Sequence, residues 1–236
     1  IDVGGDDLIN KVIKLNDGNF LIIGSTNFSG NKDILLIKID RNGNIIWQKR
    51  YGLNGNEEGL SGIEINNNNL LIVGYTNSLG AGYKDGYILK LNSNGDVLSF
   101  KTYGGSGDEI FRSIDKEGNQ IVVLGETNSW SSYWSDVFLI SVDENLNLIW
   151  ARKYYGLAWW EYGNVVKINS GNIYIAGEGG NSWNNWEWLI KTTNNGDVIW
   201  GKRILSGINN NVSIKTFKIF PDGFLIIGGY ISGGEG

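Results

Sequence analysis

The strongest constraint in this sequence is an internal repeat with a nearly constant period. The motif Gly-x-Thr-Asn begins at Gly24, Gly74 and Gly125, and looser copies begin at Gly177 and Gly228. The first glycines of successive copies are 50, 51, 52 and 51 residues apart. A fixed period of this length is typical of arrays in which each copy is one structural unit that packs against its neighbours.

Each copy has the pattern of four short β-strands. In the first copy, these strands are expected at residues 8–15, 20–23, 33–39 and 45–51. The turns Asp17-Gly18 and Asn42-Gly43 favour tight hairpins, because Asn and Gly adopt positive φ at little steric cost. No segment has the periodicity of a long amphipathic helix. The predicted fold class is therefore all-β, a β-propeller built from four-stranded antiparallel blades.

Counting the copies predicts five blades within a single propeller domain over residues 1–236, and the last blade is incomplete. The copies span approximately residues 1–52, 53–104, 105–156, 157–207 and 208–236. The fifth copy has candidate strands at 212–219 and 224–231, and residues 1–3 match only the end of a fourth strand. That blade could close with the N-terminus, continue in further sequence, or take strands from another copy. Because exposed sheet edges are usually covered, self-association at this seam is one hypothesis.

The order of the motifs also resembles a known family. Residues 103–109 read Tyr-Gly-Gly-Ser-Gly-Asp-Glu, and Gly-x-Thr-Asn-Ser, Asp-x-x-Leu-Ile-Lys-Leu/Ile-Asp and Asn-Gly-Asn/Asp-Val/Ile-Ile-Trp follow within each repeat. This order resembles the bacterial and archaeal β-propeller repeats often called SBBP repeats, over nearly the whole chain. The resemblance implies a secreted or surface-exposed array with no enzyme activity shared across the family. The fourth copy departs most, because Gly177-Glu178-Gly179-Gly180 replaces the motif and Trp occupies both of its loops.

The amino-acid composition excludes several kinds of catalytic and metal-binding site. The 236 residues include no Cys, His or Met. Ser-His-Asp and Cys-His triads, disulfides and structural zinc sites are therefore excluded. The net charge of −5 argues against nucleic acid as a partner, and no apolar run approaches the roughly 20 residues of a membrane span. The resemblance and the absent initiator Met lead us to expect a processed, extracellular or cell-surface protein.

Tryptophan is concentrated on one expected face of the propeller. In a four-stranded blade, the loops between strands two and three share a face with the connections between blades, and the hairpin turns lie on the other face. Six of the ten Trp residues map to such loops in the third and fourth copies. Clustered Trp and Tyr side chains offer large, rigid contact area. The predicted binding residues are Trp130, Tyr133, Trp134, Trp159, Trp160, Tyr162, Trp183 and Trp186.

The alternative for these loops is a small satellite core in which the indoles are buried against one another. The other four Trp residues fall on expected strands and are interpreted as core or inter-blade packing: Trp47, Trp150, Trp188 and Trp200.

Acidic residues also recur at equivalent positions of the repeat. One set precedes or opens the first strand of a copy: Asp6-Asp7, Glu57-Glu58, Asp108-Glu109 and Glu161. A second set opens the third strand: Asp33, Asp85, Asp136 and Glu187. Such carboxylates could bind Ca²⁺, and two of them could cleave a glycoside. Their repetition in every copy favours a structural role, in which they accept hydrogen bonds from the backbone amides of a neighbouring loop.

The sequence therefore predicts a non-catalytic extracellular module that binds or supports a partner, with no cofactor required. The partner would be a protein or a glycan that contacts the Trp-rich loops. Two alternatives remain open at this point. One is a carbohydrate-active enzyme with paired carboxylates near the central channel, and the other is an architectural subunit of an extracellular filament, envelope or virion.

Overall fold

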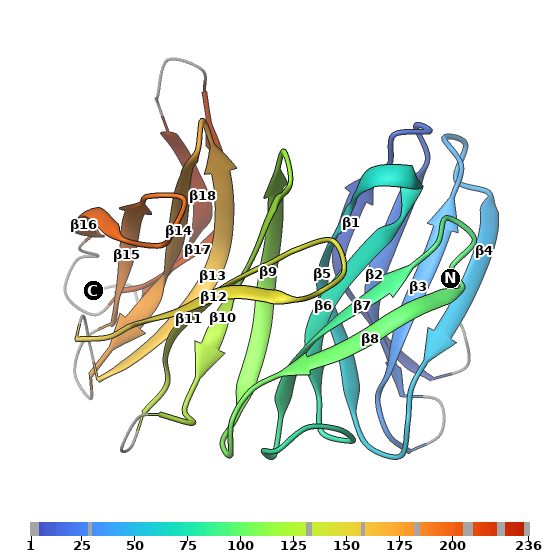
Figure 1. Cartoon of the computed structure of the whole chain (residues 1–236), viewed down its shortest axis with the longest axis horizontal. Helices are drawn as coiled ribbons and strands as arrows, with labels where there is room; N and C mark the ends of the chain where they lie inside the picture. Colours follow the sequence, from blue (N-terminus) through green and yellow to red (C-terminus); the bar gives the residue numbers. More distant parts are fainter. Residues whose placement is uncertain are drawn as a thin grey trace. The chain divides into compact units, whose positions relative to one another are not determined.

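A computed structural model of the chain describes residues 5–27, 30–130, 134–156, 159–181, 185–204, 210–220 and 225–233 (Figure 1). Within these ranges the chain forms 18 β-strands and one 3₁₀ turn, Asn66–Asn68, and it forms no α-helix. The strands make four antiparallel sheets of four strands each and one two-stranded sheet. The predicted all-β class and the four-stranded repeat are confirmed.

The strands follow one another in space as they do along the chain. Blade one contains β1 (Asp6–Lys14), β2 (Phe20–Asn27), β3 (Asp33–Ile39) and β4 (Ile45–Tyr51). Blade two contains β5 (Glu57–Glu64), β6 (Leu70–Thr76), β7 (Asp85–Leu91) and β8 (Val97–Tyr103). Blade three contains β9 (Glu109–Glu117), β10 (Gln120–Thr127), β11 (Asp136–Val142) and β12 (Leu148–Tyr154). Blade four contains β13 (Trp160–Asn169), β14 (Asn172–Gly180), β15 (Asn185–Thr192) and β16 (Val198–Ile204), and blade five is represented by β17 (Asn210–Ile219) and β18 (Leu225–Gly233).

One strand differs clearly from its expected bounds, and the difference has a simple reason. The second strand of blade one was expected to end at Ile23, but β2 continues through the Gly-x-Thr-Asn motif to Asn27 because the motif pairs with both neighbouring strands. In blade five, β17 and β18 match the expected strands closely. The expected contribution of residues 1–3 lies outside the described residues.

The chain divides into two compact units, Ile1–Phe111 and Arg112–Gly236. The first unit holds blades one and two with the beginning of β9, and the second holds the rest of blade three with blades four and five. The single domain over residues 1–236 stays a prediction. No helix within the described residues is long and apolar enough to cross a membrane.

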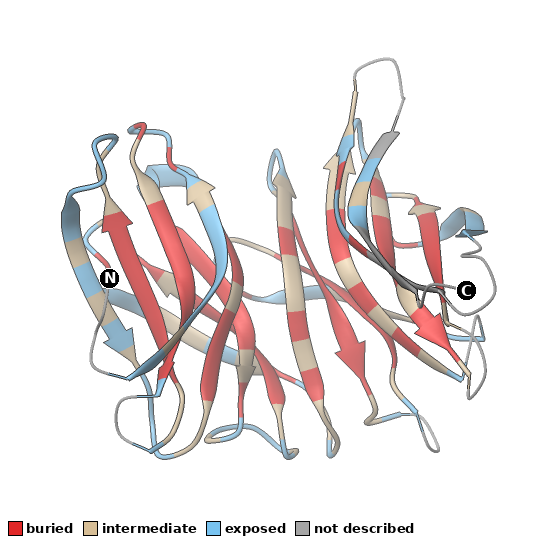
Figure 2. Ribbon diagram, turned by 180° about the vertical axis from the view of Figure 1, so that it is seen from behind, coloured by how far each residue is buried: buried red, intermediate tan, exposed pale blue. Residues whose placement is uncertain are grey.

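The core lies on the middle strands of each blade, as Figure 2 shows in red. In β2 and β3 almost every residue is buried, whereas most residues of the outer strand β4 are exposed. In the first unit, Leu36 and Ile72 belong to one apolar cluster that joins blade one to blade two. In the second unit, Leu139 and Ile175 belong to a cluster that joins blade three to blade four. Because both faces of the middle strands are covered, these strands read as continuous apolar runs.

The repeated glycine of the Gly-x-Thr-Asn motif has a steric explanation. A methyl group built on Gly74 would overlap the backbone carbonyl oxygen of Glu58, and one built on Gly177 would overlap that of Tyr162. A β-bulge in the innermost strand lies beside each of these contacts. The bulge bends that strand toward the second strand, so that only a residue without a side chain fits there.

In the first unit, the outer strand of blade one is fastened to the last hairpin of blade two. The Trp47 ring packs against Gly95, and its indole N–H donates a hydrogen bond to a carbonyl of the same hairpin (Nε1–O 3.2 Å). Lys49 forms an ion pair with Asp96 (2.8 Å), and the Tyr51 hydroxyl donates to the Gly95 carbonyl oxygen (2.7 Å). The three side chains alternate along β4 and therefore point to one face. We term this arrangement the latch.

The second unit repeats the latch between blades three and four. The Trp150 ring packs against Gly196, and the Tyr154 hydroxyl donates to the Gly196 carbonyl oxygen (2.7 Å). The Arg152 guanidinium lies 3.6 Å from the Asp197 carboxylate. A strand with the sequence Trp-x-Lys/Arg-x-Tyr therefore contacts a hairpin with the sequence Asn-Gly-Asp in the same way at two places in this chain.

Replacement of Tyr154 by Phe is expected to lower the free energy of unfolding by about 1 kcal/mol, because the buried Gly196 carbonyl loses its donor while the ring is kept. Urea unfolding of the two proteins measures this difference. Tyr155→Phe is the matched control, since the Tyr155 side chain is largely exposed and its change should leave the stability unaltered. Equal stability of the wild type and Tyr154→Phe would show that the latch hydroxyl contributes nothing.

Candidate functional site

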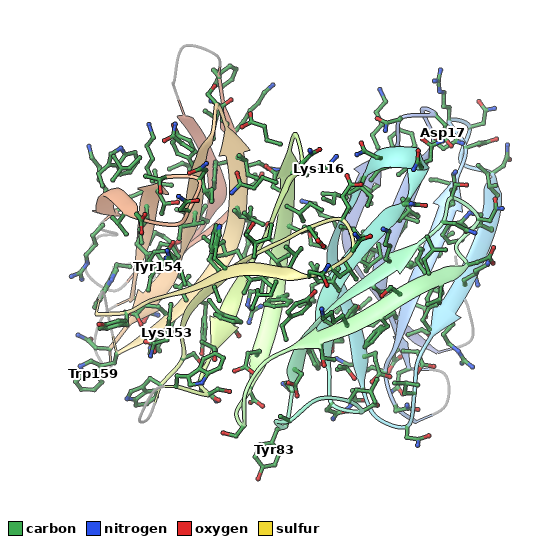
Figure 3. The ribbon with its side chains drawn as sticks, viewed as in Figure 1. Asp17, Tyr83, Lys116, Lys153, Tyr154 and Trp159 are labelled. Atoms are coloured by element: carbon green, nitrogen blue, oxygen red, sulfur yellow. The ribbon has the colours of Figure 1, made fainter. Side chains whose placement is uncertain are left out.

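The loops that carry the predicted binding residues lie at one end of the second unit. They connect β10 to β11, β12 to β13 and β14 to β15. Figure 3 places Trp159 at this end of the unit and Lys116, which precedes the β9–β10 hairpin, at the other end. The separation of a loop face from a hairpin face, expected from the sequence, therefore holds within this unit.

Four aromatic side chains are exposed at the loop end of the second unit. The exposed fractions are 55% for Trp130, 53% for Trp134, 73% for Tyr155 and 55% for Trp159. We term these four residues the aromatic patch. Single exposed aromatic residues are ordinary, but four on two adjacent loops mark a candidate contact surface. The alternative expected from the sequence was a small satellite core in which loop indoles are buried against one another. These four side chains do not form such a core, because each is more than half exposed.

Sequence reasoning missed Tyr155, the most exposed member of the aromatic patch. Its signal is an insertion: blades one and two end their outer strands in Tyr51-Gly52 and Tyr103-Gly104, whereas blade three reads Tyr154-Tyr155-Gly156. The first Tyr of that pair serves the latch, and the added second Tyr points to solvent.

Lys153 of β12 holds the two loops of the aromatic patch together. Its ammonium group donates to the carbonyl oxygen of Trp130 and to the carboxylate of Asp136, both at 2.8 Å. The same group lies 5.3 Å from the centroid of the Tyr155 ring. One cation therefore contacts the β10–β11 loop, the start of β11 and the aromatic ring that follows β12. These contacts position Trp130 and Tyr155 in the absence of any partner.

Further contacts fix the loop backbone beneath the aromatic patch. The Trp130 ring packs on Phe138 of β11, with centroids 5.6 Å apart. The backbone N–H of Glu161 donates to the Ser135 carbonyl oxygen (2.8 Å), and that of Trp159 donates to the Gly180 carbonyl oxygen (2.9 Å). The exposed rings are thus carried by loops that pair with neighbouring strands and with each other.

Three predicted binding residues lie on strands and not in loops, which corrects the sequence interpretation. Trp160 and Tyr162 belong to β13 and are half-buried, with ring centroids 4.9 Å apart. Trp186 belongs to β15 and is only 5% exposed, with the Arg203 guanidinium 3.4 Å from its ring centroid. Trp186 therefore contributes packing and not exposed surface. Two other predicted residues, Tyr133 and Trp183, lie outside the described residues.

The glycines of blade four explain why these Trp residues fit on strands. Trp160 pairs with Gly180 across β13 and β14, and Trp186 pairs with Gly179 across β14 and β15. Trp188 pairs in the same way with Gly177. Each indole thus faces a residue without a side chain, so large and small residues alternate across the sheet. The fourth copy has Gly-Glu-Gly-Gly in place of Gly-x-Thr-Asn, and these glycines leave the space that its tryptophan rings fill.

A charged cluster borders the half-buried aromatic pair of β13. Arg112 forms two hydrogen bonds with the Glu126 carboxylate (2.5 and 2.7 Å), and its guanidinium lies 5.6 Å from the Tyr162 ring centroid. Burial opposes the charge of Arg112, but the hydrogen bond and charge of Glu126 raise the Arg112 pKa above its ordinary value. Burial, followed by the Glu126 charge, raises the pKa of the Tyr162 hydroxyl. The cluster is therefore a fixed ion pair that supports the aromatic rings.

The recurring carboxylates at the starts of the first strands hold the preceding loops. Glu57 accepts hydrogen bonds from the Leu53 amide (2.8 Å) and the Thr76 hydroxyl (2.6 Å). Glu109 accepts one from the Gly105 amide (2.8 Å). These contacts are those expected for the structural role. Among the described residues, no group of three or more acidic side chains is arranged to hold a metal ion.

Glu187 differs from the other recurring carboxylates. It lies on β15 directly opposite Glu178 of β14, and its side chain has no exposed surface. Neither carboxyl oxygen has a well-formed hydrogen bond within the described ranges. Burial raises the Glu187 pKa to about 7; the charge of Glu178 raises it further, while the Ile214 amide and Lys215 oppose the shift. Glu187 is therefore largely protonated in the folded chain below neutral pH.

Comparison with known proteins supports the fold and leaves the family open. No protein-family model matches this chain. An uncharacterized protein of Aquifex aeolicus (strain VF5) is 25% identical over 174 residues, which cover 74% of this chain and 46% of that protein. The chain thus spans about half the length of this curated relative.

Two solved structures are similar to this chain in fold. The WD40 domain of Neurospora crassa Pan2 matches with a TM-score of 0.57 and 10% identity, over 95% of this chain and 61% of that domain. YjhT matches with a TM-score of 0.52 and 11% identity, over 92% of this chain and 79% of that protein. At these identities the likeness concerns the fold alone. Together with the repeated sheets, it shows that the chain has a β-propeller fold of four-stranded antiparallel blades, the fifth represented by two strands.

Proposed function

We propose that this chain is a non-catalytic β-propeller module that binds a protein or a glycan through the aromatic patch. The observation that carries the proposal is the exposure of Trp130, Trp134, Tyr155 and Trp159 on loops that are already held in place by Lys153. Ordering of side chains before binding reduces the entropy cost of association. Tyr and Trp are also the residue types that most often carry binding energy at interfaces.

The recurring carboxylates support a non-catalytic role. Glu57 and Glu109 are occupied by hydrogen bonds with backbone amides, and Glu187 has no exposed surface from which to touch a substrate. A general acid and base must both reach the reacting atoms. We therefore assign these carboxylates to the architecture of the blades and propose no enzymatic activity.

The test of the binding proposal is a screen of the immobilised chain against a glycan array and a peptide display library, followed by affinity measurements on the hits. Replacement of Trp159 by Ala is expected to raise the Kd of a specific ligand at least about tenfold, because an exposed aromatic contact is lost. Tyr83→Ala is the matched control, since Tyr83 is an exposed loop residue of the first unit (83% exposed). A ligand that binds both variants as tightly as the wild type would contradict the proposal.

We also propose that the module needs no cofactor. Most of the recurring carboxylates already have protein hydrogen-bond or ion-pair partners, such as Glu57 with the Leu53 amide and Asp136 with Lys153. Dialysis against EDTA is therefore expected to leave the Tm and the ligand Kd unchanged. A Tm that falls after EDTA treatment and returns with Ca²⁺ alone would show that a calcium site had been missed.

Membership of the SBBP repeat family and an extracellular or cell-surface location are further proposals. They are supported by the order of motifs from Tyr103 to Glu109 and through the following repeat. Protease treatment of intact cells that produce the protein tests the location. Surface exposure predicts cleavage without lysis, and protection until lysis would contradict it.

A further inference from the structure

Three loops at the patch-bearing end of the second unit share one composition. They comprise residues 128–135, 155–159 and 181–184, which join β10 to β11, β12 to β13 and β14 to β15. Of these 17 residues, six are Trp or Tyr, eight are Ser or Asn and none is charged, although charged residues make up 19% of the chain. In the first unit, Lys32 and Lys84 occupy the corresponding loops before β3 and β7. An uncharged, aromatic set of loops is therefore particular to the second unit.

The charged residues that flank these loops are buried or already paired. Asp136 directly follows the first loop, is buried, and accepts a hydrogen bond from the Lys153 ammonium group (2.8 Å). Lys153 also donates to the Trp130 carbonyl oxygen, and Figure 3 places Lys153 and Trp159 at this end of the unit. Glu161, two residues after Trp159, is buried as well. A charged partner would therefore lose its own hydration at this surface without gaining an ion pair.

The polar side chains of these loops are neutral and can both donate and accept hydrogen bonds. Ser hydroxyl groups and Asn side-chain amides have both capacities. The hydroxyl groups of a sugar have the same two capacities and carry no charge. Protein interfaces, in contrast, are enriched in Arg beside their aromatic residues, and the three loops contain no Arg. The polar chemistry of the loops therefore fits a neutral sugar more closely than a protein.

The exposed indoles favour the same class of ligand. The face of an aromatic ring is electronegative, and it attracts the weakly electropositive C–H groups on the face of a pyranose ring. Trp130, Trp134 and Trp159 are each slightly more than half exposed, so part of each ring is anchored and the rest is free for stacking. The first two loops are joined through the backbone, because the Glu161 N–H donates to the Ser135 carbonyl oxygen (2.8 Å). Rings on both loops offer more than one stacking position, which suits a chain of sugar units.

We propose that the aromatic patch binds an uncharged oligosaccharide, whose pyranose rings stack on the exposed indoles and whose hydroxyl groups bond with Ser and Asn of the three loops. This inference rests on the binding function proposed above and names the class of ligand for it. Because no ion pair contributes, the affinity does not depend on ionic strength. The affinity increases with the number of linked sugar units, since each further unit binds from a high effective concentration.

Calorimetric titration with neutral and acidic hexasaccharides tests the class of ligand. The neutral set is cellohexaose, laminarihexaose, maltohexaose and chitohexaose, and the acidic set is the hexasaccharides of hyaluronan and heparin. We expect a neutral hexasaccharide to bind at least about tenfold more tightly than either acidic one and than its own disaccharide. Its Kd should be the same at about 0.05 M and about 1 M NaCl. Tighter binding of an acidic hexasaccharide, or binding of no member of the neutral set, would overturn the proposal.

Two substitutions of Trp159 test whether ring stacking holds the sugar. Trp159→Phe keeps a flat aromatic ring, whereas Trp159→Leu keeps an apolar side chain without one. We expect the affinity for the neutral hexasaccharide to fall less than about threefold in the first variant and at least about tenfold in the second. Because Trp159 is exposed, both variants should keep the wild-type Tm. Equal affinities of the two variants would overturn the stacking contact.

The ligand class and the binding function fail in different ways. A peptide or an acidic glycan that requires Trp159 for binding would overturn the neutral oligosaccharide and leave the binding function of the aromatic patch standing. Ligands of every class that bind Trp159→Ala as tightly as the wild type would contradict the binding function itself.

Discussion

Replacement of Gly177 by Ala is expected to lower the free energy of unfolding by about 3 kcal/mol. The added methyl would overlap the Tyr162 carbonyl oxygen and the Trp188 ring. Neither neighbour can yield easily, because one is backbone at a β-bulge and the other is a buried indole. Urea unfolding at constant pH measures the loss.

Gly201→Ala is the matched control in the same blade. The nearest atom to a methyl group at this position is a side-chain carbon of Ile190 at 3.6 Å, an ordinary contact. Because Ala restricts the unfolded chain more than Gly does, this change is expected to be neutral or stabilising by up to about 1 kcal/mol. Similar losses in both variants would refute the steric explanation of the repeated glycine.

Replacement of Glu187 by Gln is expected to stabilise the chain at pH 8 by about 2 kcal/mol and to reduce the pH dependence of its stability. Burial raises the pKa of Glu187 to about 7 in the folded chain, from 4.5. The folded state therefore holds this proton more tightly than the unfolded state does. Stability is complete below about pH 4.5 and falls as the pH rises through about 7, by about 3 kcal/mol in all. A neutral Gln removes that loss.

Urea unfolding of both proteins between pH 4.5 and pH 8 measures this difference. Glu178→Gln is a second probe, because loss of the Glu178 charge lowers the Glu187 pKa and should move the pH dependence to lower values. If the wild type and Glu187→Gln lose stability in parallel across this range, Glu187 is not the group that titrates.

The strands could be predicted from the sequence because local signals mark both of their ends. Asn42-Gly43 and Asn94-Gly95 place hairpin turns at positions where the backbone requires positive φ. The buried middle strands, such as β3, read as uninterrupted apolar runs. Both signals depend on neighbours along the chain, and repetition of the motif every 50 to 52 residues reinforces them.

The candidate site could be predicted only in part, because exposure depends on contacts across the sheet. Trp159 and Trp186 were both expected in loops from the sequence, yet the first is exposed and the second is buried. The difference lies in Gly179, which faces Trp186 from the neighbouring strand and makes room for its ring. Such large-to-small pairs join residues that are distant in sequence. The exposure of Tyr155 was missed for a related reason. The sequence does not say which of the two adjacent tyrosines is buried, and only the hydrogen bond of Tyr154 in the latch shows that Tyr155 is the exposed one.

Three indoles of the second unit, those of Trp130, Trp134 and Trp159, are presented to solvent in advance of any partner. Labelling with 5-fluorotryptophan gives one ¹⁹F resonance for each of the ten Trp residues, assigned by single Trp→Phe variants. A soluble paramagnetic agent should broaden the resonances of Trp130, Trp134 and Trp159 strongly and leave those of Trp186 and Trp188 sharp. Protection of Trp130, Trp134 and Trp159 to the same degree as Trp188 would contradict the claim.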